Sequence, residues 1–158
     1  MQHLSGNPAS PRPRPACRAS AICAYPRRIV PQPPLLLIVD DEVTYLEVLA
    51  VFFQDHGYKV ITASSAGDGL QKAVLLTPSV ILMDVMMPGL TGWAALHQLK
   101  LDPRTRDIPV VMMSGRTIDT SDPTGPHRAA TALLMKPSTP QTIIETVARA
   151  LHRPSTSA

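Results

Sequence analysis

The chain has 158 residues, of which 44% are hydrophobic and 17% are charged, and this is typical of a single soluble globular domain. Uninterrupted apolar runs such as Leu35 to Val39 are far shorter than the about 20 residues that a membrane span needs, so no span is expected. The formal net charge of +3 is uneven, because the first 33 residues carry five arginines and no acid, which leaves −2 for the remainder. The predicted domain is therefore not expected to bind nucleic acid.

Residues 1–34 hold 8 of the 17 prolines, among arginine, serine and alanine. Such a segment has little apolar surface to bury, so we expect a disordered extension. An arginine-rich, acid-free leader also suits an organellar transit peptide, although prolines oppose the amphipathic helix of such a peptide. A tether to a membrane or to nucleic acid is a further alternative. Cys17 and Cys23 both lie here, and two thiols alone make neither a zinc site nor a disulfide framework, which favours a reducing cytoplasm.

From Leu35 onward, short apolar runs alternate with amphipathic segments. The apolar runs predict five strands, at 35–39, 58–62, 79–84, 108–113 and 132–135. Helices are predicted at 43–55, from Ser65 to Leu76, around Trp93 to Leu99, and from about Pro140 to Leu151. This order predicts an α/β fold with a doubly wound, five-stranded parallel sheet.

One stretch departs from that alternation. Residues 117–128 should supply the fourth of five helices, yet they contain Pro123, Gly125 and Pro126. Proline lacks a backbone N–H and clashes with the preceding helical turn. We therefore expect this helix to be shortened to about 126–131 or replaced by a loop.

Polar residues stand where the apolar runs end, namely Asp40, Asp41, Asp84, Ser114 and Lys136. Asp84 is the most informative, because it closes an apolar strand where a carboxylate is badly placed for packing. Open parallel sheets bind ligands just beyond the carboxyl ends of their strands, so these side chains are expected to meet at one point. Taken singly, the acids also suit a helix N-terminus or a loop cap, and the serine and lysine suit ordinary turns.

Residues 35–152 resemble the receiver domain of two-component response regulators in four motifs. These are Val-Asp-Asp-Glu at 39–42, Leu-Met-Asp-Val-Met-Met-Pro-Gly at 82–89, Met-Met-Ser-Gly at 112–115 and Lys-Pro at 136–137. Each motif alone is weak, but all four occur in order and at strand ends. The resemblance implies the flavodoxin-like receiver fold for 35–152, followed by a short flexible tail at 153–158.

The resemblance also implies a reaction. Asp84 would accept a phosphoryl group from a phosphohistidine on a sensor histidine kinase or a histidine phosphotransfer protein. Crowded carboxylates repel one another and favour a hard cation, and the family's cofactor is Mg²⁺, held by Asp40, Asp41, Asp84 and the backbone carbonyl of Met86. Lys136 and Ser114 would stabilise the phosphoryl oxygens. The expected protein is a cytoplasmic phosphoacceptor, not an enzyme in the usual sense.

The sequence departs from the family pattern on its output side. Leu133 stands where members usually carry an aromatic switch residue, and Ser138 stands where phenylalanine is common. The chain ends shortly after the last predicted helix, so we expect output through contact with another protein or through onward phosphotransfer. A receiver-like binding module that ignores phosphorylation is the main alternative. An aspartyl phosphohydrolase is a third hypothesis, but such enzymes generally need an acid at the position of Met86.

Overall fold

The computed structural model describes residues 32–152. The predicted extension, apart from its last three residues, and the predicted tail lie outside these residues. Within the described part, none of the helices combines the length and the hydropathy that crossing a bilayer requires.

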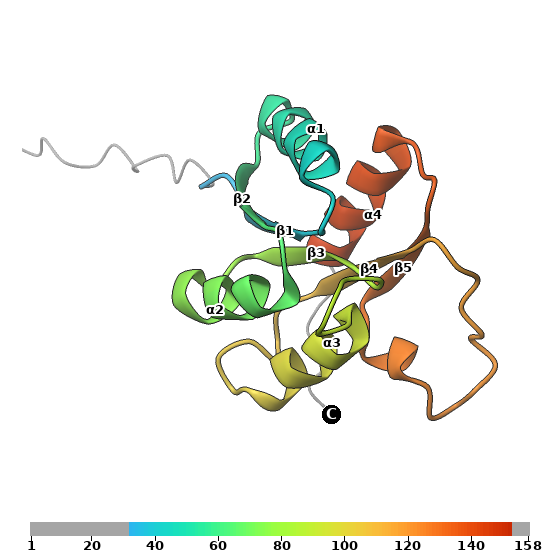
Figure 1. Cartoon of the computed structure of the whole chain (residues 1–158). Helices are drawn as coiled ribbons and strands as arrows, with labels where there is room; N and C mark the ends of the chain where they lie inside the picture. The colour runs from blue at the N-terminus through green and yellow to red at the C-terminus, as the bar shows by residue number, and fades with distance from the viewer. Residues whose placement is uncertain (1–31, 153–158) are drawn as a thin grey trace, which may run out of the picture. The chain divides into compact units, whose positions relative to one another are not determined.

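Five parallel strands form one sheet, as predicted (Figure 1). They are β1 (Leu35–Val39), β2 (Lys59–Ala63), β3 (Val80–Asp84), β4 (Val110–Ser114) and β5 (Ala132–Met135). The helices are α1 (Val43–Asp55), α2 (Ala66–Leu76), α3 (Gly92–Leu101) and α4 (Pro140–Leu151). The α2 helix begins at the predicted cap, where the Ser65 hydroxyl accepts a hydrogen bond from the Asp68 N–H at 3.2 Å.

The strand order β2-β1-β3-β4-β5 confirms the doubly wound fold. The chain moves outward from β1 to β2 and then returns across β1 to β3, so the winding reverses between β1 and β3. In such sheets this reversal opens a crevice at the carboxyl ends of the two strands. Asp40 follows β1 directly and Asp84 closes β3, so both acids lie at that crevice.

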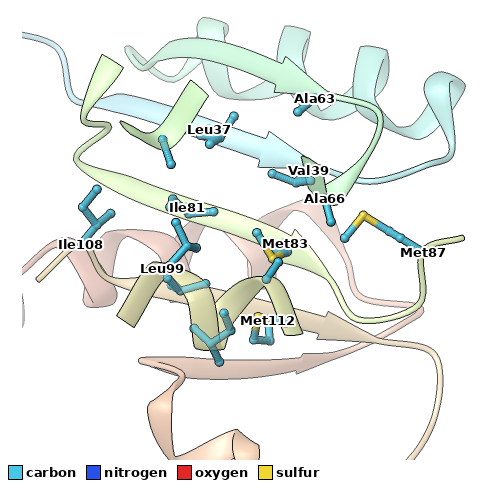
Figure 2. Packing of buried hydrophobic residues seen from close by; sticks show 14 of the residues in the cluster. Leu37, Val39, Ala63, Ala66, Ile81, Met83, Met87, Leu99, Ile108 and Met112 are labelled. Atoms are coloured by element: carbon cyan, nitrogen blue, oxygen red, sulfur yellow. The ribbon is translucent and has the colours of Figure 1, made fainter. Parts of the chain in front are cut away.

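The sheet is covered on both faces, because alternate residues of each strand point to opposite sides. One cluster joins Leu37, Val39, Ile81, Met83 and Met112 to α2 and α3, and Figure 2 shows it from close by. The other joins the intervening residues to α1 and α4, through Leu49, Phe53, Ile143 and Val147 among others. Burial on both faces explains why the strands read as continuous apolar runs.

The region between β4 and β5 contains a 3₁₀ helix, Pro126–Ala129, which is shorter than the helix predicted at 126–131 (Figure 1). Two local turns precede it, in which Asp119 accepts from Ser121 and Asp122 accepts from Thr124. Side chains of this kind compete with helical hydrogen bonds, and this adds to the effect of the prolines.

The β4 strand begins two residues later than predicted. The Ile108 N–H donates to the Thr105 carbonyl in the preceding turn, and Pro109 has no N–H to offer the ladder. The β2 strand is displaced by one residue, to Lys59–Ala63.

Candidate functional site

Three residues from distant parts of the sequence meet at the carboxyl edge of the sheet. The Lys136 ammonium, just after β5, lies 2.5 Å from Asp40 Oδ2 and 2.8 Å from Asp84 Oδ1. Both acids are almost fully buried, whereas a quarter of the lysine side chain is exposed. The lysine is thus a single cation that forms ion pairs with two buried carboxylates. The Lys136–Pro137 peptide bond is cis.

The second oxygen of each carboxylate is held by the backbone. Asp40 Oδ1 accepts the Glu42 N–H at 3.0 Å, and Asp84 Oδ2 accepts the Met86 N–H at 2.8 Å. All four carboxylate oxygens thus have a donor. This fixes the orientation of both acids and keeps one oxygen of each on the lysine.

Burial and the neighbouring opposite charges shift the pKa values of Asp84 and Lys136 in opposite directions. Burial raises the pKa of the Asp84 carboxyl above its ordinary value, although the hydrogen bond and charge of Lys136 lower it. Burial alone would lower the pKa of Lys136, but the hydrogen bonds and charges of Asp40 and Asp84 outweigh it and raise that pKa. The lysine is therefore a permanent cation at neutral pH.

Ser114 ends β4 and is buried. Its hydroxyl donates to the Arg116 carbonyl at 2.7 Å and accepts the Arg116 N–H at 3.1 Å. Within residues 32–152 it makes no hydrogen bond to Asp84. In this state the serine holds the start of the loop that leads to β5.

The structure brings only some of the predicted metal ligands together at the carboxyl edge of the sheet. Asp41 is exposed, and its side chain makes no hydrogen bond or ion pair in the described part of the chain. Met86 is half exposed and approaches Asp84 through its N–H. Across residues 32–152, no three His, Cys, Asp or Glu side chains are close enough together to hold a metal ion alone. Leu133, at the predicted switch position, is half-buried against the cluster beneath α2 and α3.

Two residues that the sequence reasoning missed shape this site. Gly92 opens α3 against the end of β3, where a Cβ atom would lie 2.0 Å from the Asp84 carbonyl oxygen. Only glycine permits that approach. Tyr45, in the first turn of α1, presents its ring to the site, with Lys136 Nζ 4.8 Å from the ring centroid. Its place five residues after Asp40, on a predicted helix, was the only signal available.

A pocket of about 320 Å³ opens beside the lysine and is lined by Glu42, Tyr45, Lys136, Pro137 and Ser138. A larger cavity of about 600 Å³ lies between β5 and α4 and includes neither acid nor the lysine. Of these two cavities, the smaller one adjoins the buried cluster, because Lys136 belongs to its lining.

Residues 36–148 match the family model of the response regulator receiver domain. The chain belongs to this family. PilH of Pseudomonas aeruginosa is 37% identical over 112 residues, which cover 71% of this chain and 93% of PilH. The phosphate regulon transcriptional regulatory protein PhoB of the same organism is 30% identical over 118 residues, and the chain spans about half (52%) of its length.

Solved structures support the assignment to the receiver family. The chemotaxis response regulator CheY4 of Vibrio cholerae has 30% sequence identity and a TM-score of 0.69, with 75% of this chain and 98% of CheY4 covered. The chain is thus a receiver domain of the two-component type, similar to PilH and CheY4. Domains of this family are signalling proteins and not enzymes of the usual kind.

Proposed function

We propose that this receiver accepts a phosphoryl group on Asp84, in a Mg²⁺-dependent reaction in the cytoplasm. The donor would be a phosphohistidine on a sensor histidine kinase or a histidine phosphotransfer protein. The domain would then signal by contact with another protein or by passing the phosphoryl group onward. The observation that carries this proposal is the Lys136 ammonium held between two buried carboxylates, with one oxygen on each.

In the proposed step, a carboxylate oxygen of Asp84 bonds to phosphorus while the phosphorus–nitrogen bond of the donor breaks. The leaving imidazole nitrogen keeps the electron pair of that bond. Phosphoryl transfer of this kind depends mainly on positioning and on neutralising charge. The Lys136 ammonium, 2.8 Å from Asp84 Oδ1, would supply positive charge beside the attacked phosphorus. Burial, which raises the pKa of Asp84, also makes its carboxylate more basic than an exposed one.

Ser114 would take part by changing its hydrogen bond. Its hydroxyl hydrogen, now on the Arg116 carbonyl, would turn to an oxygen of the phosphoryl group. The carbonyl of Arg116 would then lose its donor, so the loop after β4 would sense the modification. This route does not require an aromatic residue at Leu133.

The oxygen-rich donor set fits Mg²⁺, which is usually held by one or two carboxylates and keeps several water molecules. Asp84, the backbone carbonyl of Met86, and either Asp40 or Asp41 would bind the ion, and the other acid would reach it through water. A cluster of three acidic side chains is therefore not required of this site. When bound, the ion would supply positive charge to the phosphoryl oxygens.

The test is incubation with acetyl phosphate, with and without Mg²⁺, followed by intact-mass spectrometry. Wild type should gain one phosphoryl group only with Mg²⁺, and hydroxylamine should remove it, as expected of an acyl phosphate. Asp84→Asn should gain none, whereas Asp107→Asn, at an exposed acid paired only with Arg106, should behave as wild type. An unmodified wild type would refute the proposal and favour the phosphorylation-independent binding module.

A further inference from the structure

Tyr45 is the one aromatic residue in contact with the buried charges among residues 32–152. Its ring lies with its centroid 4.8 Å from Lys136 Nζ, within the range of a cation–π interaction. Leu46 and Leu49, both buried, anchor α1 on the sheet next to it. The helix that carries the ring is therefore held on the sheet, with the ring beside the lysine.

Lys136 needs such a support, because its other two partners change during the proposed reaction. Asp84 would become an acyl phosphate, and Asp40 would be drawn to a divalent ion. A lysine ammonium is a point charge on a flexible stem and does not hold its own position. The ring of Tyr45 is neutral and remains unaltered throughout.

The pocket beside Lys136 offers the ammonium an alternative position, away from Asp84. Glu42 lines this pocket together with Pro137 and Ser138, and its carboxylate is exposed. Once Asp40 and Asp84 are engaged elsewhere, Glu42 is an acid in the lining of this pocket that can attract the ammonium away from the acceptor. A contact that favours the inner position of the ammonium would keep it at the acceptor oxygen.

We propose that Tyr45 is a positioning residue for phosphoryl transfer: its ring face holds the Lys136 ammonium beside Asp84 while the carboxylates change partners. This inference rests on the proposed function and adds a residue to it. The charges around Tyr45 are consistent with this role. Burial raises the pKa of the Tyr45 hydroxyl, and the charges of Asp40 and Asp84 add to this against Lys136, so the ring stays uncharged at neutral pH.

The test compares Tyr45→Leu, Tyr45→Phe and the control Tyr58→Leu. Tyr58 is the matched residue, a half-buried tyrosine whose ring packs edge-on against Phe53 at 5.2 Å and does not contact the lysine. Initial rates of modification are measured with acetyl phosphate and Mg²⁺, because a small donor needs no protein docking surface. Tyr45→Leu should be slower by about three- to tenfold, as expected for the loss of one cation–π contact. Tyr45→Phe and Tyr58→Leu should retain the wild-type rate.

An NMR measurement examines the contact without the reaction. The ε-methylene protons of Lys136 should be shifted upfield by the ring current in wild type and in Tyr45→Phe, and not in Tyr45→Leu. Absence of this shift in wild type would overturn the inference even if Tyr45→Leu failed to fold.

The two proposals fail differently. A wild type that takes no phosphoryl group overturns the proposed function, and the positioning role with it. A wild type that is modified, beside a Tyr45→Leu variant modified equally fast, overturns only the role of Tyr45. Equal slowing of Tyr45→Phe and Tyr45→Leu would also overturn it, because the hydroxyl and not the ring face would then matter.

Discussion

Lys136 and Asp40 are 96 positions apart in the sequence, yet the lysine nitrogen lies 2.5 Å from Asp40 Oδ2. The same nitrogen reaches Asp84, so removing it leaves two buried acids facing each other without a cation. A buried charge that loses its partner destabilises a fold far more strongly than an exposed one. The stability of the domain should therefore depend on this lysine.

Lys136→Met should lower the free energy of unfolding at pH 7 by about 2 kcal/mol, less than for a fully buried pair because the lysine is partly exposed. The deficit should shrink as the pH falls, since burial raises the pKa of Asp84 and its protonation removes one of the unpaired negative charges. Lys72→Met, which removes the more exposed bridge to Asp68 and a hydrogen bond to the Thr62 carbonyl, should cost about 1 kcal/mol. Urea denaturation from pH 7 to pH 4 measures both. A loss in Lys136→Met no larger than in Lys72→Met would contradict this account.

Asp84→Asn should stabilise the protein at neutral pH. Because the pKa of Asp84 is raised in the folded state, its ionisation disfavours folding as the pH rises from the unfolded pKa through the folded one. Asparagine avoids that cost, so the free energy of unfolding should increase by about 1 kcal/mol at pH 7. The gain should vanish below about pH 3, where the aspartate is protonated in both the folded and the unfolded state. If the stability gain of Asp84→Asn stayed the same at acidic pH, it would not arise from the ionisation of Asp84.

Ser114→Ala should affect both stability and modification. It removes two hydrogen bonds to the Arg116 backbone, with an expected loss of about 1 kcal/mol in the free energy of unfolding. If the hydroxyl also serves the phosphoryl group, the rate of modification by acetyl phosphate should fall about tenfold. Ser121→Ala, an exposed serine bonded to Asp119, is the control and should leave that rate unchanged. Unaltered kinetics in Ser114→Ala would remove the serine from the proposed reaction.

Gly92→Ala should be strongly destabilising, by about 3 kcal/mol, because the added Cβ would overlap the Asp84 carbonyl oxygen. Gly67 supplies the matched substitution, since its Cβ would meet nothing within 4 Å on α2. Gly67→Ala should instead stabilise by about 0.5–1 kcal/mol through the higher helix propensity of alanine. Thermal denaturation of the two variants distinguishes the cases. Similar melting temperatures would show that α3 shifts freely at its start.

The sequence allowed the fold and three members of the buried cluster to be predicted. Strands covered on both faces must be apolar throughout, so Leu35 to Val39 and Val80 to Met83 are recognisable without any partner. A parallel sheet brings the carboxyl ends of its strands to one edge, and therefore Asp40, Asp84 and Lys136 could be expected together. The resemblance to receiver domains rested on the same positions.

Other features followed only from the tertiary structure. The 3₁₀ helix at Pro126–Ala129, the engagement of Ser114 with Arg116 and the isolation of Asp41 depend on how loops settle against the sheet. No period in the sequence encodes such contacts.

Local sequence patterns determined which residues are strands and which polar groups end them, because a strand buried on both faces must be apolar along its whole length. The packing of α1 against the loop after β5 decided that Tyr45 would cover Lys136. The crossing of α3 over β3 decided that position 92 must be glycine. Both are contacts between separate elements, fixed by the angle and height at which helices pack on the sheet, and these are properties of the assembled core.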